Sequence, residues 1–473
     1  MKKILIYQLL LLCSVCFLVW YFVFPHYLWF LEGNSFFSTI PDFVGIQLSL
    51  PADWAEYAGA YLLQFYSYRV IGAIMQVLFV VVILLTSDWI VFRLFRNKGL
   101  LWLSFIPVAC FISGQFDDTT LVRSMWWVAD SALLALIVWA ITIKRKMEPK
   151  GLRKFFCSPF FTYIIPCLLL APVIYSMATK EMNRVAERTH YLDYLTERRK
   201  WDTLLQEISP EDARRSLTDQ QRALLALSEQ GVLPDRVFEY GIADPSNFYY
   251  ERQDYAFCRN FNSQFFLALG FDNEVIHHSF QAGIHAPYGM NFRTMRTVID
   301  AWLRLGNYSL AEKWLNVMQH TTCHGTWTKQ RMDYLQLARS AKRKGSEKNE
   351  PFFIGAHPFL SEMARVLDAD PNDRKALDYL LCGLLVKRDL GKFYQVFDRF
   401  YTSPVSLPRY YEEALLLLAT QHPEVIQKHP VSAKKGEEFK EFYTLMNGGQ
   451  LNQQLLEMKY RDSFWFHYYA TKG

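Results

Sequence analysis

Histidines and a cysteine gather in one stretch of the sequence, where they could bind a metal or activate a nucleophile. They are His277, His278, His285, His320, Cys323 and His324. The adjacent His277 and His278 would point to different faces of a helix, and no H-E-x-x-H motif is present. His320 and His324 share a face only if a helix continues between them, and the threonines and glycine around them argue against that. We therefore predict packing and capping roles, with no metal, no cofactor and no catalytic residue.

A second set of polar residues recurs on predicted helix faces and forms a candidate binding groove. Its members are Asn260, Asn262, Gln264, Asn291, Arg293 and Arg296. Amide and guanidinium groups on the concave side of a helical array bind peptides or partner segments. The alternative is that these groups hydrogen-bond between neighbouring helices of the stack. The pattern favours neither over the other.

The elements that precede these residues are apolar and long enough to cross a membrane. We predict a transmembrane domain over residues 1–178, with about five spans at residues 4–30, 70–92, 100–115, 125–143 and 155–177. The third is the shortest and contains Pro107 and Gly114. Two carboxylates, Asp88 and Asp130, fall inside spans and are candidate functional groups, with a structural ion pair as the favoured alternative.

Lys and Arg are distributed unevenly between the loops that would separate these spans. If the N-terminus is cytoplasmic, the outer loops hold only Arg69 and Arg123. The inner loops then hold Lys2, Lys3, Arg93, Arg96, Lys98, Lys144, Arg145, Lys146, Lys150, Arg153 and Lys154. This bias predicts a cytoplasmic N-terminus. Five spans then place the remainder outside, which in a Gram-negative cell is the periplasm, whereas four would place it in the cytoplasm.

The first outer loop, residues 31–68, is acidic and aromatic. Residues 52–66 fit an amphipathic helix at the membrane surface. The loop could bind lipid or a partner, or could dock onto the soluble part of the chain.

Residues 179–473 read as a soluble array of helices with no alternating strand pattern. The segment 302–315 matches the turn of a tetratricopeptide hairpin, in which Gly306 ends one helix and Ala311 lets the next approach. A second copy occupies residues 370–400, with Gly391 at the turn, and weaker copies begin at Arg199, Gly231 and Gly270. The prediction is an all-α protein, a transmembrane bundle followed by a tetratricopeptide-like superhelix.

Other features of the chain narrow its function. The 473 residues carry a formal net charge of only +5, and the basic residues follow the spans, so we predict no nucleic-acid partner. Cys258, Cys323 and Cys382 lie far apart in the soluble part, where a disulfide between two of them is one alternative. The aromatic segment 463–469 is expected to pack on the final hairpin, on the membrane or on a partner.

The order of these parts resembles an uncharacterised family of Bacteroidetes inner-membrane proteins. The resemblance lies in the loop sequence 50–57, in residues 63–66, and in the segments 260–266 and 302–315. It implies a multi-span N-terminal domain joined to a tetratricopeptide-like region. It implies no catalytic residue.

Three hypotheses follow. The leading one is a non-enzymatic inner-membrane protein whose periplasmic scaffold binds protein partners or assembles an envelope complex, with membrane lipid around its spans and no small-molecule ligand. The second is a membrane enzyme, or an enzyme subunit, acting on envelope lipid or glycan. The third is a small-solute transporter, which would require a water-accessible Asp88 or Asp130.

Overall fold

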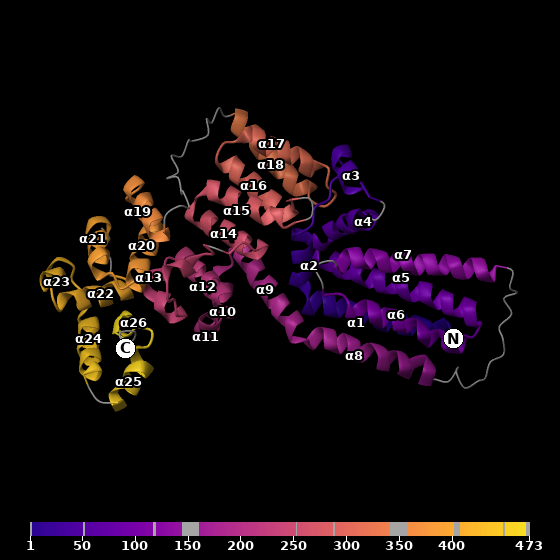
Figure 1. The fold of residues 1–473 in the computed structure, drawn as a ribbon, viewed down its shortest axis with the longest axis horizontal. Helices are drawn as coiled ribbons and strands as arrows, with labels where there is room; N and C mark the ends of the chain where they lie inside the picture. Colours follow the sequence, from indigo (N-terminus) through magenta and orange to yellow (C-terminus); the bar gives the residue numbers. More distant parts are fainter. Residues whose placement is uncertain are drawn as a thin grey trace. The chain divides into compact units, whose positions relative to one another are not determined.

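The computed structural model describes residues 2–50, 53–116, 120–143, 160–251, 253–286, 289–340, 358–401, 407–447 and 450–469 (Figure 1). Every regular element in these ranges is a helix, and no strand occurs among them, so the prediction of an all-α protein is confirmed. The helices form two compact units. Unit 1 comprises Met1–Tyr191 and Gly283–Lys344, and unit 2 comprises Leu192–Ala282 and Gly345–Gly473. The predicted domain boundary at residue 178 therefore falls inside unit 1.

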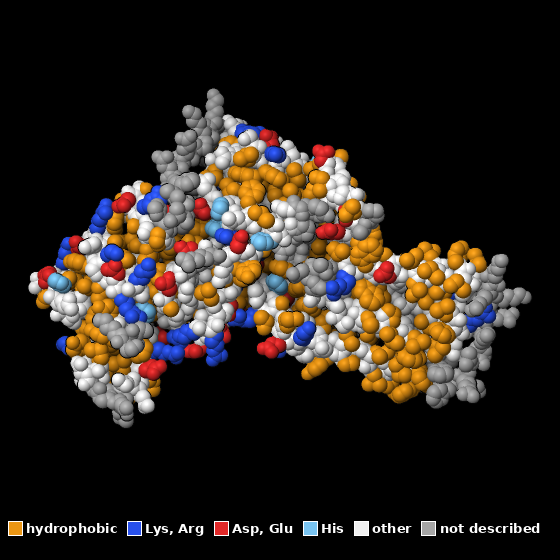
Figure 2. Space-filling model, viewed as in Figure 1, with side chains coloured by type: hydrophobic (Ala, Val, Ile, Leu, Met, Phe, Trp, Pro, Cys, Tyr) orange, Lys and Arg blue, Asp and Glu red, His pale blue; other side chains and the backbone are white. Residues whose placement is uncertain are grey.

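The N-terminal part of unit 1 is a bundle of apolar helices. Its elements are α1 (Lys2–Leu18), the π-helix η1 (Val19–Val23), α2 (Pro25–Gly33), α5 (Arg69–Phe95), the 3-10 helix η3 (Lys98–Ser104), α6 (Phe105–Ser113), α7 (Thr120–Thr142), the π-helix η5 (Phe160–Ile164) and α8 (Ile165–Thr179). Helix α5 packs against α1, α6 and α7, and α6 packs against α8. Figure 2 shows apolar side chains covering much of the visible surface of this bundle.

Two helices of the described residues are long and apolar enough to cross a membrane, Arg69–Phe95 and Leu121–Thr142. The helices Leu9–Val23 and Pro25–Gly33 pass the same test together but are bent by 74° at their junction, so they add a third span only if the bent pair is one span. The prediction of five spans is therefore wrong in number. The third and fifth predicted spans correspond to shorter apolar helices, Gly99–Ser113 and Ile165–Thr179.

Proline explains much of this difference. Pro25 starts α2 after Phe24 leaves helical geometry at φ −129° and ψ 42°, which turns the end of the predicted first span away from α1. Pro107 lies in the nine-residue helix α6, and Pro172 lies inside the 15-residue helix α8. The basic cluster at residues 144–154 and the start of the predicted fifth span lie outside the described residues.

The segment predicted as the first outer loop, residues 31–68, forms its own small helices, α3 (Pro41–Gln47), α4 (Trp54–Leu63) and the 3-10 helix η2 (Gln64–Ser67). The helix predicted at 52–66 is thus present as α4 and η2. Helix α4 packs against α7, where the Trp54 and Trp126 rings lie 5.3 Å apart. At the start of α5, a Cβ on Gly72 would lie 3.3 Å from the Tyr66 backbone, so glycine permits this close approach.

Unit 1 is completed by three helices from much later in the sequence, α16 (Phe292–Arg304), α17 (Tyr308–Gln319) and α18 (Gly325–Ser340). Helix α16 packs against α17, and α17 packs against α18. Helix α16 also contacts α2, so the outer side of the apolar bundle and these helices share one compact unit.

Unit 2 contains the remaining helices. They are α10 (Trp201–Glu207), α11 (Pro210–Arg215), α12 (Leu217–Glu229), α13 (Leu233–Arg236), η6 (Val237–Tyr240), η7 (Pro245–Phe248), α14 (Ala256–Leu269), α19 (Phe359–Ala369), α20 (Arg374–Val386), α21 (Leu390–Phe400), α22 (Arg409–Ala419), α23 (Glu424–Lys428), α24 (Ala433–Met446), α25 (Gln450–Tyr460) and α26 (Phe464–Tyr469). Helices α9 (Glu181–Glu197) and α15 (Asp272–Ile284) run from one unit into the other.

Five helix-to-helix turns share one geometry. A residue with positive φ follows the first helix, namely Arg199 (52°), Gly231 (70°), Gly270 (83°), Gly306 (75°) and Arg388 (59°). The N–H of the next residue donates to the carbonyl five positions earlier, at 2.9–3.0 Å, and the second helix starts one residue later. This is the Schellman motif, which satisfies the last carbonyls of a helix while reversing the chain. In the copy at 370–400 the turn residue is Arg388, whereas Gly391 lies inside α21.

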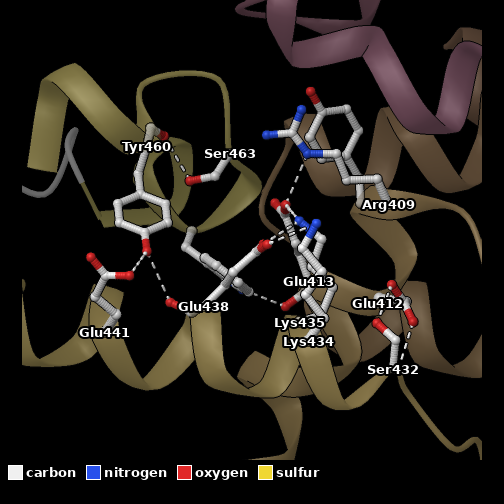
Figure 3. A network of polar contacts seen from close by, with 12 residues as sticks. Arg409, Glu412, Glu413, Ser432, Lys434, Lys435, Glu438, Glu441, Tyr460 and Ser463 are labelled. Atoms are coloured by element: carbon white, nitrogen blue, oxygen red, sulfur yellow. Dashed lines mark hydrogen bonds and ion pairs between the residues drawn. The ribbon is translucent and has the colours of Figure 1, made fainter.

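The aromatic C-terminal segment packs into unit 2, as one of the three sequence-based alternatives proposed. Phe464 and Trp465 are fully buried. The Phe464 N–H donates to Glu413 Oε2 at 2.7 Å, and the Trp465 indole N–H donates to the Glu413 carbonyl at 2.7 Å. Glu413 also accepts from Arg409 at 3.1 Å and from Lys435 at 3.2 Å (Figure 3). One buried carboxylate thus joins α22, α24 and the start of α26.

Candidate functional site

A buried carboxylate joins the outer loop of unit 1 to helices α16 and α18. Glu32, at the end of α2, is 1% exposed. Its Oε1 lies 3.1 Å from His324 Nε2, and its Oε2 lies 3.5 Å from the Arg296 guanidinium. His324 is also buried, and its ring packs 4.0 Å from that of Phe292. We call these three residues the Glu32 cluster.

Backbone hydrogen bonds extend this junction along the loop. The Phe292 N–H donates to the Ser35 carbonyl at 2.8 Å, and the Thr39 N–H donates to the His320 carbonyl at 3.1 Å. Gln64 Oε1 accepts from the Thr322 N–H at 2.8 Å. The loop therefore docks onto the helices of its own unit, which was one of the two alternatives for it.

Within unit 1, a side chain of α9 binds the start of α2. The Glu187 carboxylate accepts from the His26 and Tyr27 backbone N–H groups at 2.9 and 2.8 Å, and it lies 2.8 Å from His26 Nδ1. A carboxylate at a helix start satisfies its free N–H groups and complements the helix dipole. Helix α9 therefore begins at the end of the bundle where α1 and η1 finish.

The histidines and the soluble cysteines take structural positions. Helix α17 ends at Gln319 and α18 begins at Gly325, so no helix joins His320 to His324, as predicted. His278 is buried whereas its neighbour His277 is exposed. Cys258, Cys323 and Cys382 are free thiols. Within the described ranges, no group of three His, Cys, Asp or Glu side chains could hold a metal ion.

The candidate groove residues fall into two groups, because Asn291, Arg293 and Arg296 belong to unit 1 and the others to unit 2. Asn291 caps α16 by accepting from the Thr294 N–H at 2.8 Å. The Arg293 guanidinium lies over the Trp29 ring, 5.6 Å from its centroid. Arg296 pairs with Glu32. All three therefore take part in the packing of unit 1, and partner binding by them stays a prediction.

Asn262 organises a pocket in unit 2. This cavity of about 340 Å³ is open to solvent and is lined by Leu217, Gln221, Asp244, Ser246, Asn247, Tyr249, Tyr250, Glu251 and Gln253. One wall is the start of α12, and the other is the loop around η7. Asn262 on α14 clamps that loop, since its Oδ1 accepts from the Tyr250 N–H at 2.9 Å and its Nδ2 donates to the Tyr250 carbonyl at 2.7 Å.

Further hydrogen bonds fix the two walls of this pocket, which we call the Asn262 pocket. The Tyr250 hydroxyl donates to Thr218 Oγ1 on α12 at 2.9 Å. Asp244 caps η7 by accepting from the Ser246 N–H at 2.8 Å. The Tyr249 ring stacks on Phe265, with centroids 5.5 Å apart. Asn260 and Gln264, on the same helix as Asn262, are also buried.

Acidic groups dominate the electrostatics around this pocket. Burial raises the pKa of Tyr250 to about 12, so its hydroxyl stays protonated at neutral pH. The hydrogen bond from Ser246 holds the pKa of Asp244 below its usual value, so Asp244 is ionised. Behind Tyr249, burial raises the pKa of Glu274 to about 7, and the nearby Glu362 adds to the rise. The pocket lining can therefore offer carboxylates, amide groups and the edges of two largely buried tyrosines to a ligand.

The two candidate intramembrane carboxylates lie in different surroundings. Asp88 on α5 accepts a hydrogen bond from the Ser104 hydroxyl, which carries no charge. Arg93, one turn away, donates instead to Thr142 Oγ1 at 2.8 Å. Asp130 is exposed on the face of α7. The structure brings neither carboxylate to the Glu32 cluster or to the Asn262 pocket.

Sequence reasoning missed Glu32 as the partner of Arg296 and His324, and it missed the pocket-lining loop. A single carboxylate at the end of an apolar segment signals a buried partner, but the sequence does not indicate which one. The run Asp244-Pro-Ser-Asn247 is a turn signature that could have marked the loop. The buried position of Asn262 has no local signal, because it depends on the contact with Tyr250.

Comparisons with known proteins identify the family and no characterised relative. No curated protein matches the chain, and no solved structure does. The profile of one protein family, described as a family of unknown function, matches residues 2–178 and 122–471. Together these stretches cover nearly the whole chain, which therefore belongs to the family DUF6057.

Proposed function

We propose that the chain is an integral inner-membrane protein whose helices outside the bundle form a tetratricopeptide-like scaffold that binds other proteins. In this proposal the N-terminus is cytoplasmic and the scaffold is periplasmic. The observation that carries the proposal is the fivefold recurrence of one Schellman turn between paired helices.

The recurrence supports a repeat protein because each turn reverses the chain with the same local geometry. Paired helices bury only part of their apolar surface, so neighbouring pairs stack. At the turn in unit 1, Gly306 has φ 75° and Ala311 is completely buried beneath the second helix. Both features match the predicted hairpin. Stacked helix pairs present extended surfaces on which peptide segments dock.

The apolar bundle supports the membrane assignment. Large apolar side chains on the outer face of α7 are exposed by 47–64%, including Leu133, Leu136 and Ile141. Such a surface is costly in water and favourable in lipid. The aromatic side chains Trp54 and Trp126 lie near the loop end of α7, as interfacial aromatics do.

Contacts within unit 1 support a periplasmic location for the scaffold, and this support does not depend on the number of spans. Glu187 on α9 holds the start of α2, directly after α1 and η1. The Glu32 cluster then ties the first outer loop to α16 and α18. If α1 and η1 cross the membrane from a cytoplasmic N-terminus, α9 and these later helices emerge on the opposite side. This holds whether the remaining apolar helices add an odd or an even number of spans.

Two measurements test the proposal. Alkaline phosphatase, which is active only outside the cytoplasm, is fused after Gly473 and compared with a green fluorescent protein fusion at the same position. We expect phosphatase activity and a dark fluorescent fusion. Fluorescence with an inactive, stable phosphatase fusion would put the scaffold in the cytoplasm and overturn the orientation.

The scaffold role is tested by photo-crosslinking in cells, with a reactive residue at exposed positions of unit 2. We expect crosslinked proteins of defined mass at some positions and none at others. A chain that yields no crosslinked protein at any position, but modifies an envelope lipid or glycan when purified, would instead be an enzyme.

A further inference from the structure

The Asn262 pocket contains an unused acceptor that points to a ligand. Gln221 is 1% exposed and lines the pocket from α12. Its Oε1 accepts no hydrogen bond from any side chain or backbone group of the described residues. A buried carbonyl of this kind requires a donor, either from water or from a bound N–H group. Gln221 therefore places an acceptor without a donor in the wall of the pocket, beneath its surface.

The charges lining the pocket select the sign of that ligand. Two carboxylates, Asp244 and Glu251, line it, and no Lys or Arg does so among the residues that the structure describes. Glu274 and Glu362 lie close enough to Tyr249 to act on it electrostatically. This arrangement attracts a cation and repels phosphates and carboxylates.

Two cations near the pocket already interact with acidic groups of their own. The buried Arg222 guanidinium is 3.9 Å from Asp193, and the exposed Lys387 acts on Asp244. Neither lines the cavity. Their presence lowers the net negative charge and does not provide an anion site inside the pocket.

Shape and lining narrow the ligand further. A volume of about 340 Å³ lies at the small end of the roughly 300–1,000 Å³ typical of ligand pockets. It fits one long side chain with the peptide groups beside it, and it is too small for a helix. Tyrosine faces bind lysine and arginine through cation–π contacts. The amides of Asn247 and Gln253, with Gln221, can pair with peptide N–H and C=O groups.

We propose that the Asn262 pocket binds the lysine or arginine side chain of an extended segment of a partner protein. The basic group lies between Glu251 and the two tyrosines, and the flanking peptide groups bond to the amides of Gln221, Asn247 and Gln253. The inference rests on the proposed scaffold function and names the chemistry that this scaffold recognises.

The test uses the full chain in nanodiscs and fluorescein-labelled Gly-Ser nonapeptides that differ only in a central Arg, Lys, Gln or Glu. Binding is followed by fluorescence anisotropy. We expect the Arg and Lys peptides to bind about tenfold more tightly than the Glu peptide, and the difference to shrink as salt screens the charges. Equal binding of all four peptides, or binding of none, would overturn the proposal.

Variants localise the interaction. Glu251→Gln removes a charge that lines the pocket and should lower the affinity for the Arg peptide several-fold. Glu437→Gln removes an exposed charge on α24 and should leave that affinity unchanged. Ser246→Trp fills the pocket from an exposed position and should abolish binding. Arg252, whose placement lies outside the described residues, is changed to Gln. Removing this positive charge should leave binding of the Arg peptide undiminished, and tighter binding of the Glu peptide than of the Arg peptide to the wild type would contradict the inference.

Photo-crosslinking in cells separates this inference from the proposed function. A reactive residue is placed at Ser246, beside the pocket, and another at the exposed Met458 on α25. Crosslinks at Met458 with none at Ser246 would leave the scaffold standing and overturn the pocket as its site. Preferential Arg-peptide binding without any crosslinked protein would support the pocket and overturn the scaffold.

Discussion

The Glu32 cluster and the Asn262 pocket each contain one residue that the same sequence pattern selected, Arg296 and Asn262, yet they differ in what their polar groups can do. In the cluster, Arg296 and His324 point at one carboxylate that is closed off from solvent. In the pocket, Asn262 forms its hydrogen bonds with Tyr250, and the cavity that the Tyr250 loop lines is open to solvent. The comparison teaches that a polar residue on a helix face can seal a junction or build an opening.

The energetic reason lies in what each arrangement leaves unsatisfied. A buried charge is tolerated when its partners surround it, and removing one partner is costly. An open pocket keeps its polar groups hydrated until a ligand replaces the water. Mutations should therefore damage folding at the cluster and damage binding at the pocket.

The largest effect is expected at Glu32. Glu32→Ala leaves Arg296 and His324 without their buried acceptor, and we expect a loss of about 3 kcal/mol in the free energy of unfolding of unit 1. Hydrogen exchange in α16 and α18 should rise in the same variant. The matched control is Glu312→Gln on α17, which breaks an exposed pair with Arg339 and should not change stability measurably. Equal stability of Glu32→Ala and the control would show that the loop is held by other contacts.

A second effect, close to the first in size, is expected at Glu413. Its carboxylate joins α22, α24 and α26 (Figure 3), and Glu413→Gln weakens bonds to Arg409, Lys435 and the Phe464 N–H. We expect a loss of roughly 2 kcal/mol, measured by hydrogen exchange of the backbone amides of α22, α24 and α26. Glu412→Gln, one residue away and bonded to the exposed Ser432, is the control. Glu413 does not enter the pocket, so peptide binding should persist in the folded fraction.

Asn262 should affect both folding and binding, because it holds the loop that lines the pocket. Asn262→Ala removes both hydrogen bonds to Tyr250 and leaves the Tyr250 N–H and carbonyl buried without these partners. We expect the free energy of unfolding to fall by about 1–2 kcal/mol. The loop around η7 should exchange its amide hydrogens faster, and peptide affinity should fall through loss of pocket shape. A folded variant with unchanged loop exchange would contradict the role of Asn262 as the clamp.

The smallest effect depends on pH. Burial, with help from Glu362, raises the pKa of Glu274 to about 7, well above the usual value of about 4.3. The folded state then holds the proton more strongly than the unfolded state, so the stabilisation from protonated Glu274 is lost as the pH rises from about 4 through about 7. Burial also lowers the pKa of His278 to about 3, so this neighbour stays neutral over most of that range.

Glu274→Gln tests this directly by thermal unfolding at several pH values. The variant should match the wild type near pH 4.5 and exceed its Tm by roughly 2–4 °C near pH 8. Glu437→Gln on the solvent face of α24 should follow the wild type at every pH. A constant offset between Glu274→Gln and the wild type across the range would exclude ionisation of Glu274 as the cause.

Local chemistry made part of this fold predictable. Gly231, Gly270 and Gly306 mark helix ends because glycine adopts positive φ without strain, and the sequence pattern located each of them. The sequence pattern predicted one turn at Gly391, whereas the structure has it at Arg388. No sequence signal marks an arginine that adopts positive φ. The span count failed for a related reason. Hydropathy registers apolar content, but it does not register the break at Pro25 or the 3-10 geometry of η3.

The candidate site was less predictable because its contacts are distant in sequence. Nothing near Arg296 indicates Glu32, and nothing near Asn262 indicates which loop it clamps. Patterns selected the right residue types in both places. Which of these residues become buried and which line an open pocket depends on how helices from distant segments pack.

The partners of α2 also set an order of events during synthesis. Glu187, Arg296 and His324 are all translated long after Glu32 has left the ribosome. At about 5–20 residues per second, the wait between Glu32 and His324 is roughly 15 to 60 seconds. For that time the Glu32 carboxylate lacks His324, and for about the first half of it the start of α2 also lacks Glu187. The contacts that hold the segment 31–68 against α16 and α18 therefore form only after most of the chain has been translated.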